Sequence, residues 1–358
     1  MKLIEKIKQK AFSKYLLWKT RPCRIKKYLD KKEIPDTNRR EPPDSGNVKI
    51  ASAQVRLKMV SEPLEYVETM FRLVKRAYYE GAQIIVFPEY NFLQLLGMLP
   101  GIDKIAPKDK TAEKFGGIDL DGLDILDVFR FLTPVMKVIF ATTYSELARR
   151  FGIYIITGSV LLSEKDGSVY SVAMLYDDKG RLVGQQKKLH LMPVEAEMGI
   201  NCGQEIRVFD TRLGKIAFPI CMDATYFETF RMLELMGADI VFLPIADNDY
   251  NEWKALRGIW PRVQESSIYG VKSALVGEIL GMDFAGKSGI YAPMELTKNK
   301  DGIVVEAESA DKEELVIGEV CLNKLHEFRR QKHIIGDRNL ELYERYFPKL
   351  YENLYKEQ

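Results

Sequence analysis

The stretch GAQIIVFPEY at residues 81–90 has a near copy, GADIVFLPIA, at residues 237–246. Each copy follows a segment with helical periodicity, turns at Gly-Ala, and runs through apolar residues into a proline. This repeat predicts two similar halves that each supply a buried strand to the core, although an α/β chain can also contain such a pair by chance.

The pattern around both copies predicts further strands and helices. The expected strands lie at residues 48–55, 83–87, 154–162, 172–176, 182–187 and 240–243, and the expected helices at 64–79 and 226–236. Residues 177–180, with the sequence DDKG, form the expected turn between two of these strands. The alternation predicts an α/β protein whose helices flank extended sheets.

Composition places the chain among soluble globular proteins. It has 358 residues, of which 46% are hydrophobic and 29% are charged, enough for one large domain or two ordinary ones. Its longest apolar runs have the length of a strand, well short of the roughly 20 residues of a membrane helix. The four scattered cysteines and three histidines show no zinc-type spacing and no disulfide density, which favours a reducing cytoplasm and no metal site.

The first 27 residues are strongly basic. Ten Lys or Arg and one acid give this segment a charge of about +9, so the rest of the chain carries about −7. Apolar residues recur at helical spacing between the lysines, namely Ile4, Ile7, Ala11, Tyr15 and Trp18. The pattern predicts a helix on an anionic membrane surface, which would make a cytoplasmic protein peripheral to the inner membrane. The alternative is a helix docked on the body or on a neighbouring subunit, and binding of nucleic acid is not expected.

Three reactive side chains follow apolar strands. Glu89 follows IIVFP, Cys221 follows KIAFPI, and Lys188 follows the strand at 182–187. Ligands in α/β proteins gather beyond the carboxyl ends of strands, so these positions are where chemistry is expected. Each residue alone also has an ordinary structural interpretation: a buried cysteine, a turn glutamate and a solvated lysine.

Together the three residues form a thiol-based catalytic set. A cysteine at the start of a helical turn is favoured as a thiolate, and the backbone N–H of Met222 can stabilise an oxyanion. Glu89 in an apolar pocket can take the thiol proton and return it to a leaving amine, because burial raises a carboxylate pKa. Lys188 can stabilise the negative charge that develops on the substrate.

These residues resemble the carbon–nitrogen hydrolase superfamily of nitrilases, aliphatic amidases and N-carbamoyl amino acid hydrolases. The resemblance rests on VFPEY (86–90), DDKGRLVGQQKKLHLMP (177–193), GKIAFPICMDATYF (214–227) and MGADIVFLP (236–244). Shorter similarities occur in TGSV (157–160), GKSGIYAP (286–293) and DRNLELY (337–343). The sequence MDATYFE after the cysteine differs from many relatives, which leaves the substrate open.

The resemblance implies Glu89 as general base, Lys188 as oxyanion stabiliser and Cys221 as nucleophile. It also implies a second carboxylate after the lysine, for which both Glu195 and Glu197 are candidates. The implied fold is a four-layer α-β-β-α sandwich that forms a homodimer or larger homo-oligomer, with the C-terminal segment reaching over a partner and no metal or organic cofactor. Tyr90 and Ala246, which end the two copies of the repeat, are candidate substrate contacts.

The expected organisation is an N-terminal extension and linker at 1–47, a hydrolase domain at 48–345 and a tail at 346–358. The segment from Asn91 to Leu132 is a lid, a pocket wall or a packing excursion at a subunit interface. The expected reaction is hydrolysis of an amide or carbamoyl-type small molecule through a cysteine acyl-enzyme. The alternatives are acyl transfer to lipid or peptide amines at a membrane surface, and a catalytically silent scaffold of the same fold.

Overall fold

The structure, a computed structural model, describes residues 2–35, 46–100, 102, 125–252, 258–332 and 338–357. The helices are α1 (Lys2–Lys19), α2 (Pro22–Leu29), α3 (Pro63–Tyr79), α4 (Ile125–Phe151), α5 (Pro193–Glu197), α6 (Phe227–Leu235), α8 (Ile259–Ser266), α9 (Leu322–Lys332) and α10 (Leu340–Glu357). The 3₁₀ turns are η2 (Asn91–Met98), η5 (Cys221–Ala224) and η6 (Met294–Leu296). The strands are β1 (Asn47–Arg56), β2 (Ile84–Val86), β3 (Tyr154–Ser163), β4 (Val169–Tyr176), β5 (Leu182–Lys187), β6 (Phe209–Thr211), β7 (Gly214–Ala217), β8 (Ile240–Ile245), β9 (Tyr269–Ile279), β10 (Met282–Phe284), β11 (Gly289–Tyr291), β12 (Ile303–Glu306) and β13 (Glu314–Cys321).

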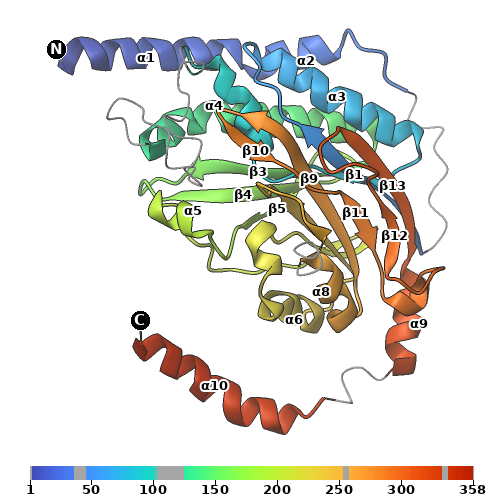
Figure 1. Ribbon diagram of the computed structural model, residues 1–358. Helices are drawn as coiled ribbons and strands as arrows, with labels where there is room; N and C mark the ends of the chain where they lie inside the picture. The colour runs from blue at the N-terminus through green and yellow to red at the C-terminus, as the bar shows by residue number, and fades with distance from the viewer. Residues whose placement is uncertain are drawn as a thin grey trace.

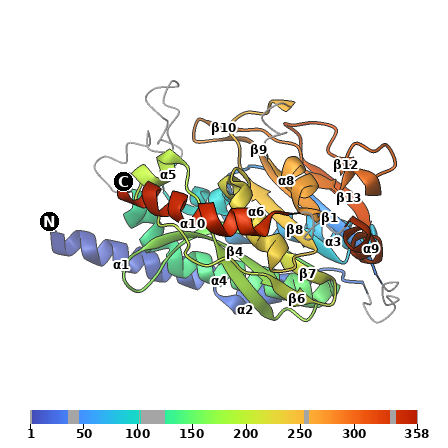
Figure 2. The same cartoon turned by 90° about the horizontal axis from the view of Figure 1, so that it is seen from below.

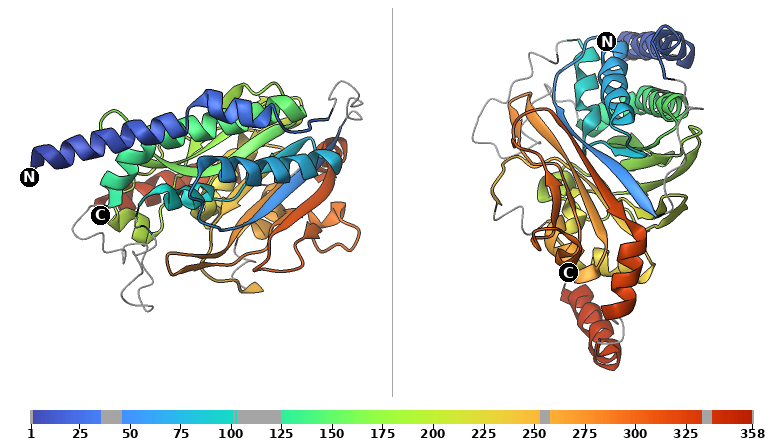
Figure 3. Two further views of the ribbon diagram at one scale, coloured as in Figure 1. Left: turned by 90° about the horizontal axis from the view of Figure 1, so that it is seen from above. Right: turned by 90° about the vertical axis from the view of Figure 1, so that its right-hand side faces the viewer.

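Three apolar cores separate four layers of secondary structure. Alternate residues of a strand face opposite sides, and in β2 Ile85 packs toward helices α3 and α4 while Ile84 and Val86 pack between the sheets. In β8, Phe242 packs between the sheets and Val241 packs toward helices α6 and α8. Helices therefore cover both outer faces of a pair of sheets (Figures 1 and 3), and the predicted α-β-β-α sandwich is confirmed. Burial on both faces explains why these strands are continuously apolar.

The two halves repeat one strand pattern. In the first half β1, β2 and β3 are parallel neighbours, and β4 and β5 follow antiparallel. In the second half β7, β8 and β9 are parallel neighbours, and β11 and β12 follow antiparallel. The repeated stretch provides β2 in one half and β8 in the other, at the same place in each pattern.

The Gly-Ala turns before β2 and β8 are built alike. Gly81 and Gly237 both adopt a φ of +83°, which favours glycine. The residue two positions later then binds the backbone of the adjacent strand. The Lys49 N–H donates to Gln83 Oε1 at 2.7 Å, and the Lys215 N–H donates to Asp239 Oδ2 at 2.9 Å. The sequence repeat therefore reflects a repeated structure.

One strand continues further than its sequence predicts. The prediction ended the strand before Pro244, but β8 runs on to Ile245. A proline lacks the N–H that a strand residue donates to the strand beside it, so in a strand with neighbours on both sides it usually leaves a hydrogen bond unmade. Strand β7 pairs with β8 only as far as Val241, so Pro244 has a neighbour on the β9 side alone and its missing donor breaks no ladder.

The N-terminal helices dock on the body along α4, at the top of Figure 1. The buried contacts are Leu16 of α1 and Ile25 and Leu29 of α2. The predicted apolar stripe is therefore not the docking face: Tyr15 and Trp18 remain 48% and 53% exposed. Most of the predicted linker and residues 103–124 of the predicted lid segment lie outside the described residues.

Helix α10 lies at the opposite side of the molecule, beneath α6 (Figures 1 and 2). It runs without a break from Leu340 to Glu357, so the predicted boundary between residues 345 and 346 falls inside one helix. No helix among the described residues is long and apolar enough to cross a membrane.

Candidate active site

The ends of three strands bring Glu89, Lys188 and Cys221 together. Glu89 follows β2, Lys188 follows β5, and Cys221 follows β7. The Lys188 ammonium lies 2.8 Å from Glu89 Oε1, and both side chains are buried. Glu89 also interacts with the thiol of Cys221.

The TGSV segment on β3 positions the turn that carries Glu89. Gly158 has a φ of +71°, and a Cβ there would lie 1.9 Å from the Pro88 carbonyl oxygen. Only glycine therefore lets β3 approach the Pro-Glu turn so closely. Next to it, the hydroxyl of Ser159 accepts a hydrogen bond from the Tyr90 N–H at 3.1 Å.

Glu195, and not Glu197, is the second carboxylate that contacts the lysine. Glu195 Oε1 lies 2.8 Å from Lys188 Nζ and also accepts a hydrogen bond from the Tyr90 hydroxyl. Its other oxygen accepts the Met192 N–H at 2.7 Å, which caps the first turn of α5. Glu197 ends the same short helix on its exposed side. The lysine ammonium is thus held between two buried carboxylates.

Two residues of the site have left-handed backbones. Tyr90 has a φ of 54° and Cys221 a φ of 45°, both uncommon for residues with a side chain. Such conformations cluster where a site fixes a side chain in one direction. Here they end the strands that carry the carboxylate and the thiol.

Asp223, which the sequence analysis assigned no role, joins the lysine and cysteine segments. Its buried carboxylate accepts the backbone N–H groups of Ile220 at 2.8 Å and of His190 at 2.7 Å, and it lies 3.1 Å from His190 Nδ1. The Leu189 N–H also donates to it at 3.0 Å. The signal in the sequence was the Cys-x-Asp spacing, because a carboxylate two residues after the cysteine can accept N–H groups on both sides of the turn.

Burial and neighbouring charges shift the proton affinities of these groups. Burial raises the pKa of Glu89 to about 7, with Lys188 opposing the rise and Glu195 adding to it. Burial also raises the pKa of the Cys221 thiol, and the charge of Glu89 raises it further. Burial disfavours the Lys188 ammonium, but Glu89 and the other anionic groups outweigh this and raise its pKa. The resting site therefore holds a protonated lysine and a neutral thiol.

The helix predicted at residues 226–236 forms at Phe227–Leu235, and it does not begin at Cys221 itself. Cys221 opens the short 3₁₀ turn η5, and α6 starts only at Phe227. A helix terminus acts mainly within its first turn, so α6 does not stabilise a resting thiolate. This agrees with the raised thiol pKa and leaves deprotonation to a neighbouring base.

A pocket of about 730 Å³ opens on the half-buried Cys221. Met222 and Ala246 line it, and backbone atoms of Ala246 interact with the thiol. Tyr90, the other predicted substrate contact, is buried with Glu195.

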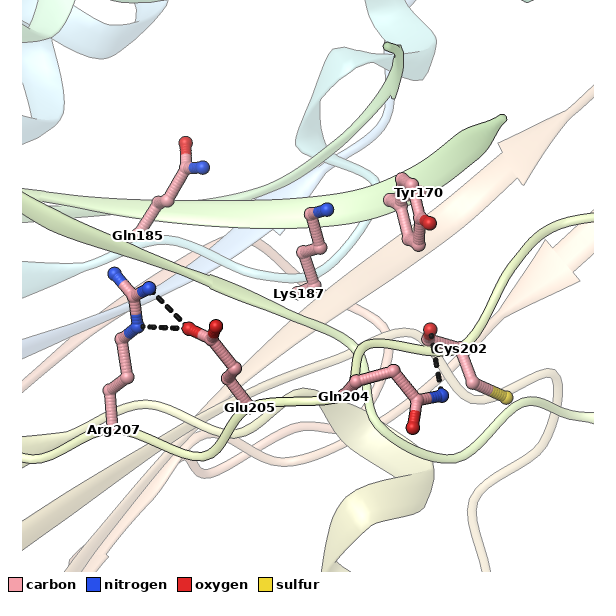
Figure 4. Close-up of a pocket in the computed structure, with 7 residues that line it drawn as sticks. All are labelled: Tyr170, Gln185, Lys187, Cys202, Gln204, Glu205 and Arg207. Atoms are coloured by element: carbon pink, nitrogen blue, oxygen red, sulfur yellow. Dashed lines mark hydrogen bonds and ion pairs between the residues drawn. The ribbon is translucent and has the colours of Figure 1, made fainter. Parts of the chain in front are cut away.

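A second hollow of about 210 Å³ lies over β4, β5 and the segment after α5 (Figure 4). Its cations are already paired: Lys187 is bound to Glu164 at 2.6 Å and stacks on Tyr170, and Arg207 contacts Glu205. We therefore assign no chemistry to this hollow. Within the described residues, no group of three or more His, Cys, Asp or Glu is placed to hold a metal ion.

Comparison with known proteins agrees with this architecture. The carbon–nitrogen hydrolase family model matches residues 49–330. A probable hydrolase, YhcX, of Bacillus subtilis is 34% identical over 213 residues, which cover 57% of this chain and only 41% of that protein. A nitrilase of Pyrococcus abyssi is 29% identical and is covered over 99% of its length, with 83% of this chain matched.

The fold also matches solved structures. An amidase from Nesterenkonia sp. AN1, solved as a double mutant with acrylamide, superposes with a TM-score of 0.64 at 17% identity, covering 86% of this chain and 100% of that one. At this identity the likeness concerns the fold alone. The family match, however, covers most of the chain and includes all the strands that carry Glu89, Lys188 and Cys221. The chain therefore belongs to the carbon–nitrogen hydrolase family of enzymes.

Proposed function

We propose that the protein hydrolyses a non-peptide carbon–nitrogen bond of an amide or carbamoyl-type small molecule through an acyl-enzyme on Cys221. The observation that carries the proposal is the arrangement at Lys188. Its ammonium is held 2.8 Å from both Glu89 and Glu195, beside a thiol that lines a pocket. An ammonium has three N–H donors, and two are used, so one remains for a substrate oxygen.

In the acylation half, ionised Glu89 takes the thiol proton and the thiolate attacks the substrate carbonyl carbon. The new C–S bond places negative charge on the carbonyl oxygen, which the Lys188 ammonium and the Met222 N–H stabilise. When this intermediate collapses, the C–N bond breaks and protonated Glu89 gives its proton to the leaving nitrogen. Glu195 and Tyr90 hold the lysine in place throughout.

In the deacylation half, Glu89 takes a proton from water as the water oxygen attacks the thioester carbon. The second tetrahedral intermediate is stabilised by the same donors and expels the thiolate. The proton on Glu89 returns to the sulfur, and the acid leaves. Each half thus uses one carboxylate first as base and then as acid, for which a pKa near neutrality is suited.

The test is ammonia release from a panel of linear amides, ω-amides, carbamoyl amino acids and nitriles. Release that depends on Cys221 supports the proposal and narrows the substrate class. If the protein hydrolyses none of these compounds but transfers an acyl group from a lipid or peptide donor to an amine, its function is acyl transfer and not hydrolysis. Activity in neither assay would indicate a catalytically inactive scaffold protein of the same fold.

We further propose that α1 attaches the enzyme to an anionic membrane surface. Its docked position leaves the side chains of Tyr15 and Trp18 facing outward. Arg21 and Arg24 lie 5.4 and 5.3 Å from the Trp18 ring centroid, so cationic groups surround the exposed aromatic side chain. Aromatic residues flanked by basic ones are typical of helices at the interface of anionic bilayers.

Vesicle binding tests this surface. We expect the wild type to sediment with vesicles containing phosphatidylglycerol and not with pure phosphatidylcholine, and added salt should weaken the binding. The double variant Tyr15→Ser/Trp18→Ser should bind at least about 10-fold more weakly, because both outward aromatic anchors are lost. Tyr79→Ser removes an aromatic that is 62% exposed elsewhere and serves as the control. Equal binding by the double variant and the wild type would exclude α1 as the anchor.

We also propose a homodimer formed through α6 and α10. Apolar side chains of α10 recur at heptad-like spacing on a helix that is exposed along its length, namely Leu340, Tyr343, Phe347, Leu350 and Leu354. The C-terminal end of α6 adds the exposed Leu235, and the next residue adds the exposed Met236. Exposed apolar patches of this kind mark protein interfaces, and a second copy can cover both helices through a self-complementary contact.

The dimer is tested by mass in solution. Light scattering after gel filtration should give twice the chain mass for the wild type, and Phe347→Glu/Leu350→Glu should give a monomer, because two charges would be buried at the interface. A control variant, Lys349→Glu, changes the charge of the same helix without removing apolar surface. A monomeric wild type at micromolar concentration would contradict the proposal.

A further inference from the structure

Three polar side chains form a cluster within the apolar core of α3 and α4. Tyr66 of α3, Tyr144 of α4 and Asn91, the first residue of η2, are all fully buried. The two tyrosine hydroxyls lie 2.7 Å apart, and the Asn91 amide donates to the Tyr144 hydroxyl oxygen at 2.7 Å. A longer contact of 3.3 Å joins the same amide nitrogen to the Tyr66 hydroxyl. The cluster therefore ties η2 to both helices.

The donors of this cluster have acceptors. Tyr66 can donate to Tyr144, whose own hydroxyl lies 3.3 Å from Met70 Sδ and can donate to the sulfur. The side-chain oxygen of Asn91 accepts from Gln94 Nε2 at 3.1 Å, which turns the amide nitrogen toward the tyrosines. A fully satisfied buried polar network rigidifies its surroundings and specifies one arrangement of the side chains.

The cluster contacts the chain on both sides of Glu89. Asn91 is two residues after Glu89, and the ring of Phe87, two residues before it, lies 5.4 Å from the Tyr144 ring between centroids. On the sheet side, β3 holds the same turn through Ser159. The residue between Glu89 and Asn91 has a left-handed backbone, a conformation that persists only when its surroundings fix it. Helices and sheet together fix the turn that carries the carboxylate.

The cluster acts on Glu89 through the backbone. Among the described residues, the pocket wall includes neither tyrosine of the cluster nor Asn91. The charged or titratable groups that act on Glu89 all belong to the site itself, namely Lys188, Glu195, Cys221 and Tyr90. Burial raises the pKa of both tyrosine hydroxyls in the cluster, so the cluster stays neutral while Glu89 titrates.

We propose that Asn91, Tyr144 and Tyr66 are positioning residues, which hold the Glu89 turn where the carboxylate can take the thiol proton of Cys221. This inference rests on the proposed hydrolase function and adds the groups that aim its general base. Proton transfer requires the base within hydrogen-bond reach of the proton. A misplacement of about 1 Å can lower a rate by about 10²-fold.

Steady-state kinetics test the positioning role. Asn91→Leu replaces the amide by an apolar group of similar size, and Tyr144→Phe removes only a hydroxyl. We expect each to lower kcat at least about 10-fold and to change KM less than about 3-fold, because the pocket walls remain. Tyr66→Phe loses the longer contact to Asn91 and should lower kcat less. Tyr269→Phe removes a buried hydroxyl outside the cluster, bound to the Cys321 carbonyl oxygen at 2.9 Å, and should retain wild-type kcat.

The titration of Glu89 gives a readout that needs no substrate. Infrared spectra along a pH series show the C=O band of protonated carboxyl groups, and the component lost in Glu89→Gln belongs to Glu89. Its midpoint in the wild type should lie near the pKa of about 7. In Asn91→Leu and Tyr144→Phe the midpoint should fall toward the ordinary glutamate value, because a loosened turn admits water and burial is what raises this pKa. In Tyr269→Phe it should stay at the wild-type pH.

The two readouts separate this inference from the proposed function. A midpoint shifted in the cluster variants of a protein that hydrolyses no amide would overturn the hydrolase and keep the hold of the cluster on Glu89. Wild-type kcat and midpoint in both Asn91→Leu and Tyr144→Phe would overturn the positioning role alone. An equal loss of kcat in Tyr269→Phe would also overturn it, since the cause would then be general destabilisation. Circular dichroism checks folding, and Tyr66→Phe serves in place of a variant that does not fold.

Discussion

Replacing Cys221 with alanine should lower kcat on any amide substrate by at least about 10³-fold, the scale found when a covalent nucleophile is removed. In the proposed mechanism the sulfur is the atom that forms the acyl bond, and it lies beside Glu89. Substrate affinity should change far less, because the methylene and the pocket walls remain. The comparison therefore separates lost chemistry from lost binding.

Two controls make the result specific. Cys202→Ala removes an exposed thiol outside the pocket and should retain wild-type turnover. Mass spectrometry after rapid quenching should show the acyl group on wild-type protein, in the peptide that contains Cys221, and no adduct on the alanine variant. Full activity in Cys221→Ala would exclude the cysteine mechanism, since no acyl-enzyme could then be required.

The fold was predictable where local pattern and burial agree. Strands β2 and β8 are apolar on both faces and begin after a Gly-Ala turn, and the structure places them at equivalent positions in two halves. The end of β8 was not predictable in the same way. Whether Pro244 ends the strand depends on which side of β8 the neighbouring strand lies at that residue. The order and lengths of the strands in the sheet decide this.

The N-terminal helix shows a different limit. Its periodic apolar residues predicted one face, but Leu16 is the side chain that α4 buries, and Tyr15 and Trp18 face outward. A helix rich in both aromatic and aliphatic residues has two usable faces, and periodicity alone does not say which one meets the body.

The site was predicted as far as it depends on reactive groups at strand ends. The structure brings Glu89, Lys188 and Cys221 together and selects Glu195 over Glu197, a choice that depends on how α5 turns. Strand β9 (Tyr269–Ile279), which carries the buried Lys272 of the pocket wall, was not predicted from the sequence, so the burial of this lysine could not be predicted either.

The pH dependence of kcat/KM should show an acid limb with its midpoint near the Glu89 pKa of about 7. The direction of this pH dependence follows from the proposed role of Glu89 as general base. Glu89 must be ionised to take the thiol proton, and burial raises its pKa, so activity is low below that pKa and rises as pH increases through it. Glu89→Gln should abolish the limb and lower kcat/KM by about 10²- to 10⁴-fold, because the amide can neither accept nor return a proton.

A second variant tests the cause of that pKa. The charge of Glu195 contributes to the raised value, so Glu195→Gln should shift the acid limb to lower pH, alongside any loss of rate from a less firmly held Lys188. Glu197→Gln, on the exposed side of the same helix, should leave the midpoint at the wild-type pH. A limb that moved upward in Glu195→Gln, or that persisted in Glu89→Gln, would assign the titration to a different group. The general base would then have to be sought outside the pair of carboxylates that hold the lysine.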